Sequence, residues 1–178
     1  MLSIREAKVD DLNAIHLIYY AAFDEEEKDR VANLAIDLLS ENTTPNTFAL
    51  VAEKDHKILG HVGLSPLGIE SNISLTAYIL APLAVMPDTQ KQGIGSRLIE
   101  YAIDQFTKQG VNLLFVYGDP QYYGRFGFDA ENATPYVTPY ELKYPFGWLA
   151  RVLNTPSEMN QQSMNIRCVP SLNDPVLW

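Results

Sequence analysis

The sequence predicts an α/β (α+β) fold in which a mixed, mainly antiparallel sheet carries helices on both faces. Residues 47–53 and 58–69 are two strand-like segments joined by the polar turn 54–57, as expected of an antiparallel hairpin. Residues 77–86 form an apolar run too short to span a bilayer, which indicates a buried strand. A helical pattern follows, and then comes the almost wholly apolar segment 111–117. This last segment is typical of a strand that runs parallel to its predecessor across a helix.

Composition limits the chain to one domain. Its 178 residues, 47% of them hydrophobic, suffice for one core and are few for two, so we expect a single domain over residues 1–178. The net charge of −9, from 13 basic and 22 acidic residues, argues against nucleic acid and anionic membranes as partners. A cationic small molecule or a basic peptide suits it better. Residues 1–6 lack the apolar core of a signal peptide, which predicts a cytoplasmic protein.

The N-terminal part predicts a strand and two helices. Residues 4–7 suit a short strand, and Asp10 or Asp11 can cap the helix that follows. The inward face of that helix would comprise Leu12, Ile15, Ile18 and Ala22. A second helix is expected after Asp24, with an acidic start at residues 25–27 that complements the helix dipole. Its inward residues would be Val31, Leu34, Ala35 and Leu38.

Residues 72–86 are expected to continue the sheet, with Pro82 requiring a bulge or an edge because proline cannot donate a ladder hydrogen bond. After the strand 111–117, Asp119 can cap a short helix over residues 121–126. Residues 141–153 are expected to include a short helix, and residues 164–169 a final strand.

The segment between the apolar strand and the next helix has the features of an anion site. Helical spacing over residues 90–109 predicts a helix whose first backbone N–H groups lack intrahelical partners and point into the preceding turn. Gly93 and Gly95 let a phosphate approach the backbone, while Lys91 and Arg97 add positive charge. The third glycine of a dinucleotide fold and the Gly-Lys-Ser/Thr of a nucleotide-triphosphate loop are both missing.

This stretch resembles the acetyl-coenzyme A loop of the GNAT superfamily of N-acetyltransferases, whose pattern is Val-x-Pro followed by Gln/Arg-x-x-Gly-x-Gly/Ala. Here the pattern is Val85-Met86-Pro87 and Gln90-Lys91-Gln92-Gly93-Ile94-Gly95. The opening Ile-Arg-x-Ala strand and the Tyr-x-x-x-Gly-Phe segment that ends at Phe128 are similar to the family as well. The amino-acid sequence around Tyr123 resembles that of the YhbS-like bacterial subgroup of predicted acetyltransferases. The matching segments cover roughly residues 2–130, the motif-bearing core, and residues 131–178 would be a C-terminal extension that completes the sheet.

The resemblance implies direct transfer of an acetyl group from acetyl-CoA to a primary amine of a small molecule or peptide, in a ternary complex and without a metal. It implies that the strand with Pro82 bulges and diverges from the strand 111–117, with the pantetheine arm between them. It assigns coenzyme binding to Leu83, Ala84, Val85, Gln90, Lys91, Gln92, Gly93, Ile94, Gly95 and Ser96. It also assigns Tyr123 as the proton donor to the departing thiolate, with Tyr122 as the competitor. The protein would act as a monomer or homodimer.

The sequence leaves several assignments open. Many relatives carry a glutamate base on the strand before the loop, and residues 78–81 offer no carboxylate, which leaves His61, Glu70, Asp119 or a water relay. A catalytically weak acyl-CoA sensor is therefore the alternative function. Residues 25–27 either form a solvated helix start or an acidic rim of the acceptor groove. The aromatic residues of 136–148 either line the acceptor site or pack a loop onto the core: Tyr136, Tyr140, Tyr144, Phe146 and Trp148. Cys168, the single cysteine, is expected to be a packed thiol rather than a nucleophile.

Overall fold

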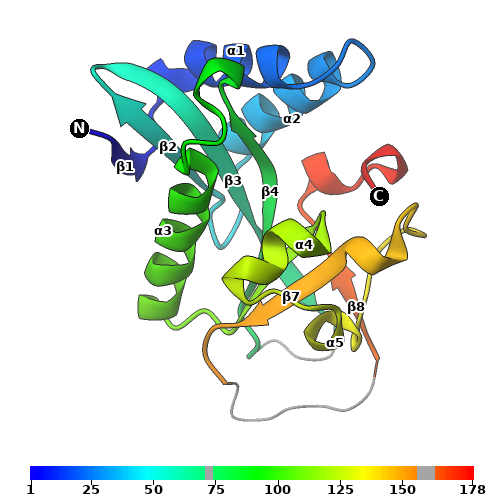
Figure 1. The fold of residues 1–178 in the computed structure, drawn as a ribbon. Helices are drawn as coiled ribbons and strands as arrows, with labels where there is room; N and C mark the ends of the chain where they lie inside the picture. Colours follow the sequence, from blue (N-terminus) through cyan, green and yellow to red (C-terminus); the bar gives the residue numbers. More distant parts are fainter. Residues whose placement is uncertain (71–73, 156–162) are drawn as a thin grey trace. The chain divides into compact units, whose positions relative to one another are not determined.

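The computed structural model describes residues 1–70, 74–155 and 163–178 (Figure 1). In chain order the elements are β1 (Ser3–Glu6), α1 (Leu12–Ala22), α2 (Lys28–Ser40), β2 (Phe48–Lys54), β3 (Lys57–Ile69), β4 (Ala77–Val85), α3 (Ile94–Lys108), β5 (Leu113–Tyr117), α4 (Pro120–Tyr123), α5 (Ala130–Ala133), β6 (Tyr136–Val137), β7 (Trp148–Val152) and β8 (Met164–Arg167). The hydrogen-bonded strand order is β1-β2-β3-β4-β5-β7, and β8 pairs with both β3 and β6. The predicted mixed sheet is confirmed; the start of the predicted strand 72–86 lies outside the described residues.

The described chain forms two compact units, which are treated separately below. The first unit comprises Met1–Leu64 and Ala81–Ala102, and the second comprises Ser65–Leu80 and Ile103–Trp178. The elements β3, β4 and α3 each contribute residues to both units. The sequence-based division into a core over residues 1–130 and an extension over 131–178 stays a prediction.

The first unit is built on the predicted hairpin. β2 and β3 pair antiparallel from Phe48↔Leu64 to Lys54↔Lys57, and β1 pairs antiparallel with β2. Asp55 and His56 form the two-residue turn with φ of 51° and 60°. Short polar residues tolerate this left-handed conformation better than β-branched ones do, so the turn predicted from the polar segment is formed as a tight connection.

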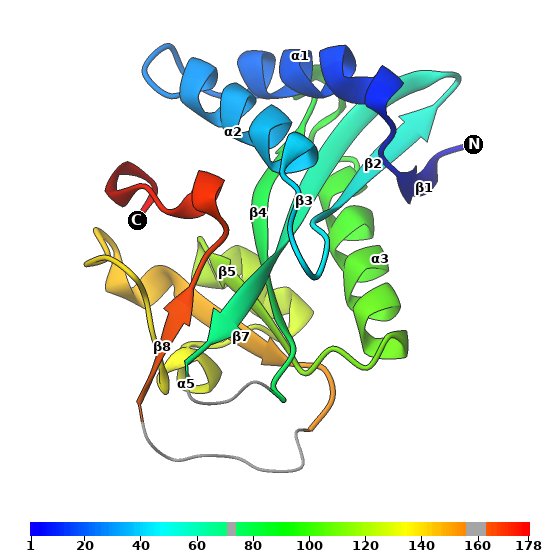
Figure 2. The ribbon, with the colours of Figure 1, turned by 180° about the vertical axis from the view of Figure 1, so that it is seen from behind.

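Helices cover both faces of this part of the sheet, because successive side chains of a strand point to opposite faces. On one face His61 of β3 meets Tyr19 of α1, and α2 packs beside α1 (Figure 2). On the other face a Cβ added to Gly60 would lie 3.1 Å from side-chain atoms of both Ile94 and Leu98 of α3. Most predicted inward positions of α2 are buried: Leu34, Ala35 and Leu38, together with Ala32.

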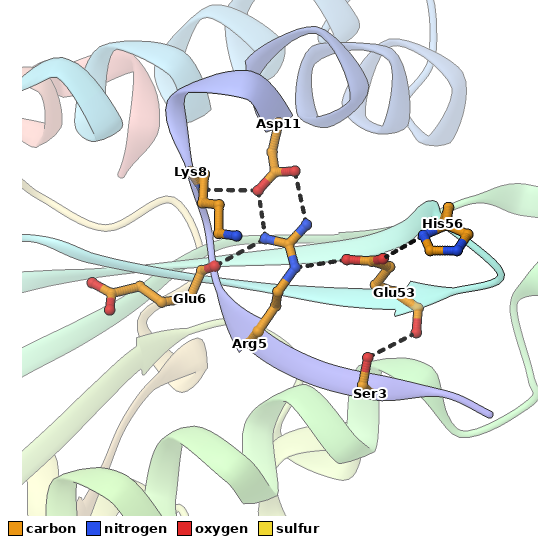
Figure 3. Close-up of polar contacts among 7 residues, drawn as sticks. All are labelled: Ser3, Arg5, Glu6, Lys8, Asp11, Glu53 and His56. Carbon is orange, nitrogen blue, oxygen red and sulfur yellow. Dashed lines mark hydrogen bonds and ion pairs between the residues drawn. The ribbon is translucent and has the colours of Figure 1, made fainter.

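The prediction that an aspartate side chain caps α1 is wrong, because no such hydrogen bond forms. Asp11 occupies the capping position, but its carboxylate makes no cap hydrogen bond to the helix. It accepts two hydrogen bonds from the Arg5 guanidinium, at 2.7 and 2.9 Å, and one from the Lys8 backbone N–H (Figure 3). The charge-assisted fork from Arg5 takes the oxygens that a cap would use.

The acidic start of the second helix is a solvated one. The Lys28 ammonium lies 2.6 Å from the Glu25 carboxylate, and Arg30 pairs with Glu27 at 3.4 Å. Both glutamates are exposed. Both pairs join residues three positions apart at the start of the helix.

The second unit centres on β5. Its residues Leu113–Phe115 pair in parallel with Ala77–Ile79 of β4, as predicted, and the whole of β5 pairs antiparallel with β7. The side chain of Phe115 stacks on Trp148 with a centroid distance of 5.0 Å and meets Tyr136 edge to face at 5.1 Å. These buried aromatic rings fill the space beside the strand.

Within residues 141–153, where a short helix was expected, the structure has a short helical turn and also the strand β7, which was not predicted. Only Pro145–Gly147 form a short helical turn, of the 3-10 type, and Trp148–Val152 form a strand. The segment carries a β-bridge from Ala150 to Asp129 on its other side. The pairing with β5 explains why tertiary contacts override the weak local helical pattern.

The predicted final strand is confirmed as β8 at residues 164–167. Cys168 follows it and is partly buried, and this burial raises the pKa of its thiol to about 12. A thiol with that pKa holds its proton at neutral pH, which agrees with a packing role. Among the described residues, none of the helices combines the length and apolarity that crossing a bilayer demands.

Candidate functional site

The glycine loop lies in the first unit, between β4 and α3. Pro87–Thr89 form a turn of 3-10 helix, after which Lys91 and Gly93 both adopt left-handed backbone conformations, with φ of 61° and 80°. A Cβ added to Gly93 would have nothing within 4 Å, so it would project into open space beside the loop. The loop surface is exposed at Gln90, Lys91, Gln92 and Gly93.

The backbone of this loop keeps its donors free. The bond from Arg97 N–H to Gly93 O, at 3.0 Å, is the first of helix α3. Over the parts of the chain that the structure describes, no hydrogen bond is recorded for the N–H groups of residues 91–96. Free donors at the positive end of a helix, beside two cationic side chains, form a suitable cradle for a phosphate.

Gly60 of β3, which the sequence analysis did not single out, lies against the first turn of α3 and so supports the loop. Ile94 is buried and meets the β3 backbone at Gly60, where an added Cβ would crowd Ile94, Leu98 and the Ala84 carbonyl at 3.1 to 3.3 Å. The missing side chain at Gly60 thus lets the first turn of α3 pack closely on the sheet. A glycine within an apolar strand is the signal that points to such a close approach.

The end of β4 also belongs to the sequence-predicted coenzyme site. Leu83 and Val85 are partly buried and Ala84 is buried. The Val85 carbonyl accepts a hydrogen bond of 3.1 Å from the Gln90 side chain, and Met86 N–H donates to Leu59 O. The Gln90 side chain therefore folds back onto the end of β4 and stabilises the loop. In this conformation the side-chain amide bonds the backbone of β4.

The predicted divergence of β4 from β5 remains a prediction. The recorded parallel ladder comprises Ala77↔Leu113, Tyr78↔Leu114 and Ile79↔Phe115, although β4 continues to Val85 and β5 to Tyr117. A short ladder of this kind agrees with the prediction. The bulge expected at Pro82 likewise stays a prediction.

Tyr123 lies in the second unit, at the end of α4. Asp119 caps this helix by accepting from Gln121 N–H at 2.8 Å, as predicted. The Tyr123 ring packs on Gly118, where an added Cβ would come within 2.5 Å of it, and meets Phe128 edge to face. Burial raises the pKa of Tyr123 above the ordinary range of a phenol, with a smaller contribution from Tyr122. The hydroxyl is therefore protonated at neutral pH.

Tyr122 occupies a different environment. Its ring lies 4.6 Å from the guanidinium carbon of Arg125 and meets Tyr123 edge to face at 5.0 Å. The guanidinium of the exposed Arg125 thus lies over the face of the partly buried Tyr122 ring. The two neighbouring tyrosines are thus distinguishable by their partners.

His61, a candidate base in the sequence, is buried in the first unit with 1% of its surface exposed. Its Nδ1 lies 2.8 Å from the Tyr19 hydroxyl, and its Nε2 has no hydrogen-bond partner in the described parts of the chain. Burial lowers the pKa of His61 to about 3, opposed by the charge of Asp11. A histidine with so low a pKa is a weak base for an ammonium group.

The carboxylate candidates are engaged as well. Glu70 accepts hydrogen bonds from Asn165 and from Arg167, and these hold its pKa below the usual range. Asp119 is committed to the cap of α4. The lowered pKa values of His61 and Glu70 make both weak bases for an ammonium group, and the Asp119 carboxylate is occupied by its cap hydrogen bond. In the described residues no cluster of three or more histidine, cysteine or acidic side chains could bind a metal.

The known proteins that this chain resembles include proteins named as N-acetyltransferases. Residues 45–130 match the model of the acetyltransferase (GNAT) domain. YjhQ of Escherichia coli K12, an uncharacterized N-acetyltransferase, is 34% identical over 118 residues, which cover 63% of this chain and 65% of that protein. YhbS of the same strain, also an uncharacterized N-acetyltransferase, is 33% identical over 104 residues, 58% of this chain and 60% of its own length. The chain thus spans less than two thirds of the length of these curated relatives.

Two solved structures extend the likeness to almost the whole chain. The Escherichia coli YhbS structure in complex with CoA has a TM-score of 0.82 at 23% identity, covering 97% of this chain and 92% of that one. A GNAT family acetyltransferase from Brucella melitensis in complex with acetyl-CoA has a TM-score of 0.67 at 25% identity, covering 92% and 94%. These likenesses confirm the predicted fold class.

Proposed function

We propose that the chain, whose residues 45–130 match the acetyltransferase (GNAT) domain model, is an acetyl-CoA-dependent N-acetyltransferase that acts on a primary amine of a small molecule or peptide. The observation that carries the proposal is the loop of residues 90–96, with its run of free backbone donors. The structural relatives in complex with CoA and with acetyl-CoA support the same coenzyme here.

In this proposal the pyrophosphate of acetyl-CoA binds the N–H groups between Gln92 and Ser96. Gly93 keeps the approach open, since its missing side chain would project into the space beside the loop. Lys91 and Arg97 contribute positive charge, and both are exposed. The residues Leu83, Ala84, Val85, Gln90 and Ile94 would serve the site through backbone contacts and packing.

The reaction is direct transfer. The neutral amine nitrogen attacks the thioester carbonyl and a C–N bond forms. The nitrogen, then cationic, gives its extra proton to water, and the C–S bond breaks to release CoA thiolate. Tyr123 is the proposed proton donor to that thiolate. Its raised pKa keeps the proton in place, but a phenol above pKa 10 is a weaker acid than a thiol near 8.5. Its contribution is therefore a hydrogen bond to the developing negative charge, which strengthens as the sulfur departs.

The amine must lose a proton before it attacks. With an alkylammonium pKa of about 10.4, only about one molecule in a thousand is neutral near pH 7.4. His61, Glu70 and Asp119 are engaged or mismatched, so we assign the proton transfer to water. Turnover should then rise with pH through the neutral range.

A catalytically weak acyl-CoA sensor is the second candidate, and the same lack of a free base favours it. Release of thiol separates the two functions. Purified protein is incubated with acetyl-CoA and a panel of amines, amino acids and peptide N-termini, and free CoA is measured with a thiol reagent. Amine-dependent release supports the transferase. Binding of CoA without release for any acceptor favours the sensor.

A further inference from the structure

Four of the five aromatic residues of 136–148 divide into two groups by exposure, while the fifth, Tyr140, is half-buried and donates its hydroxyl to the Asn173 carbonyl at 3.2 Å. Tyr136 and Trp148 are buried, and the Trp148 indole donates to the Tyr136 carbonyl at 3.0 Å. Tyr144 and Phe146 instead expose 50% and 65% of their surface. Their rings lie beside one another, with a centroid distance of 5.9 Å. We call this pair the aromatic turn.

The aromatic turn is held firmly although its rings face solvent. Tyr144 N–H donates to the Tyr117 hydroxyl at 2.8 Å, and Gly147 N–H donates back to Tyr144 O at 2.8 Å. Lys143 N–H donates to the carbonyl of Trp178, whose indole stacks on Tyr117. A fixed backbone that presents two large apolar rings to water is typical of a binding surface.

The same anchor connects the aromatic turn to Tyr123 within the second unit. Gly118 N–H donates to Gly147 O at 2.9 Å, and an added Cβ at Gly147 would lie 2.9 Å from Gly118 O. The ring of Tyr123 also packs against Gly118. Gly118 thus contacts both the Tyr123 ring and Gly147, the residue next to Phe146, and the Tyr117 ring packs beside Gly147.

Charge around the aromatic turn favours a cation. The segments 117–119, 140–147 and 173–178 carry the carboxylates of Asp119, Glu141 and Asp174, against the single ammonium of Lys143. That ammonium lies 5.3 Å from the centroid of the Tyr144 ring, so this ring already faces a cation. Electron-rich ring faces with an acidic surround attract organic ammonium ions that also carry an apolar group.

We propose that Tyr144 and Phe146 select the acceptor, and that the acceptor is a primary ammonium bearing an aromatic or large aliphatic group. This inference rests on the proposed N-acetyltransferase function and adds the substrate class to it. The acceptor's apolar group lies against the two rings, while its amine is directed toward the side of the unit where Tyr123 lies. Tyr144 and Phe146 act as specificity residues and take no part in the proton transfers.

The test compares two amines that differ only in a phenyl group, 2-phenylethylamine and ethylamine. We expect a kcat/KM at least about tenfold higher for 2-phenylethylamine, because its ring gains the burial that ethylamine lacks. Phe146→Ala and Tyr144→Ala should each reduce that preference several-fold through KM, with kcat and the KM for acetyl-CoA unchanged. Val137→Ala, which alters another exposed apolar side chain, on β6, is the matched control and should keep the preference.

A binding measurement separates this inference from the proposed reaction. Trp148 and Trp178 both lie in the aromatic cluster, so 2-phenylethylammonium should change tryptophan fluorescence in a saturable way that Phe146→Ala weakens. Such binding without turnover would support the acceptor surface and contradict acetyl transfer. Turnover of both amines with equal kcat/KM, or an unchanged preference in the Tyr144→Ala/Phe146→Ala double variant, would overturn the inference and leave acetyl transfer standing.

Discussion

The hydroxyl of Tyr19 lies 2.8 Å from Nδ1 of His61, and the two rings meet edge to face with a centroid distance of 5.5 Å. Tyr19 on α1 is fully buried, as is His61 on β3. This pair joins the helix to the sheet in the first unit. It converts a histidine that could have been a base into a neutral structural group.

The first prediction concerns acid stability. Burial lowers the pKa of His61 to about 3, whereas the unfolded chain has a histidine pKa near 6.5. Between these values the unfolded state binds the proton and the folded state does not, so the free energy of unfolding falls as the pH falls. From pH 7.5 to pH 5.0 the loss due to this group should be roughly 2 kcal/mol.

Urea unfolding at the two pH values measures this loss, and His61→Gln should remove it whatever its effect on stability at pH 7.5. His56→Gln is the control, because the His56 side chain is fully exposed. Equal losses in wild type and His61→Gln would show that His61 is not the group responsible.

A second prediction concerns Arg5. Its guanidinium forks onto Asp11 and also lies 2.6 Å from the Glu53 carboxylate, so one side chain joins β1, β2 and the start of α1 (Figure 3). Arg5→Lys keeps the charge but loses the planar fork, and should reduce the free energy of unfolding by about 1–2 kcal/mol. Lys108→Gln, which breaks the ion pair between the exposed side chains of Lys108 and Asp104, should cost less than about 0.5 kcal/mol. Thermal unfolding at matched salt compares them, and equal small effects would refute a special role for the fork.

The third prediction separates phosphate binding from backbone strain. Gly93 and Gly110 have φ of 80° and 78°, and an added Cβ at either meets nothing within 4 Å. Alanine at either position should therefore destabilise the fold by a similar amount, about 1 kcal/mol. At a hundred times its dissociation constant, CoA should add about 2.7 kcal/mol to the wild type and to Gly110→Ala.

Gly93→Ala should lose most of that CoA-dependent stabilisation, because its methyl group stands where the phosphate approaches. Differential scanning fluorimetry with and without CoA gives the comparison. If Gly93→Ala keeps the same CoA-dependent shift as Gly110→Ala, the coenzyme does not bind this loop.

The fourth prediction concerns Tyr123. Tyr123→Phe keeps the ring that packs on Gly118 and Phe128, so stability and CoA affinity should stay near wild type. Turnover should fall by roughly 10²- to 10³-fold, the usual effect of removing a hydrogen-bond donor aimed at charge that develops in the transition state. Tyr122→Phe serves as the control and should do much less. Steady-state rates need an acceptor on which chemistry limits turnover, since slow product release would hide the effect. Near wild-type turnover of Tyr123→Phe on such an acceptor would reduce the tyrosine to a packing group.

Much of this molecule follows from local sequence patterns. The hairpin of β2 and β3, the parallel strand β5 and the glycine loop before α3 each have a signal within a short segment. Alternation, helical spacing and turn residues act over neighbouring positions, so they are readable without the fold. The match of residues 45–130 to the GNAT domain agrees with the motifs found there.

Other features depended on contacts between residues far apart in the chain. Residues 148–152 form a strand because they pair with β5. Asp11 does not cap α1 because both oxygens of its carboxylate accept hydrogen bonds from Arg5. The sequence left His61 open as a base and the aromatic residues open as lining or packing. Tertiary structure buried His61 against Tyr19, and it placed Trp148 in the core while leaving Phe146 exposed. Burial and partner choice are set by the whole fold, and these two quantities decide a side chain's pKa and its access to substrate.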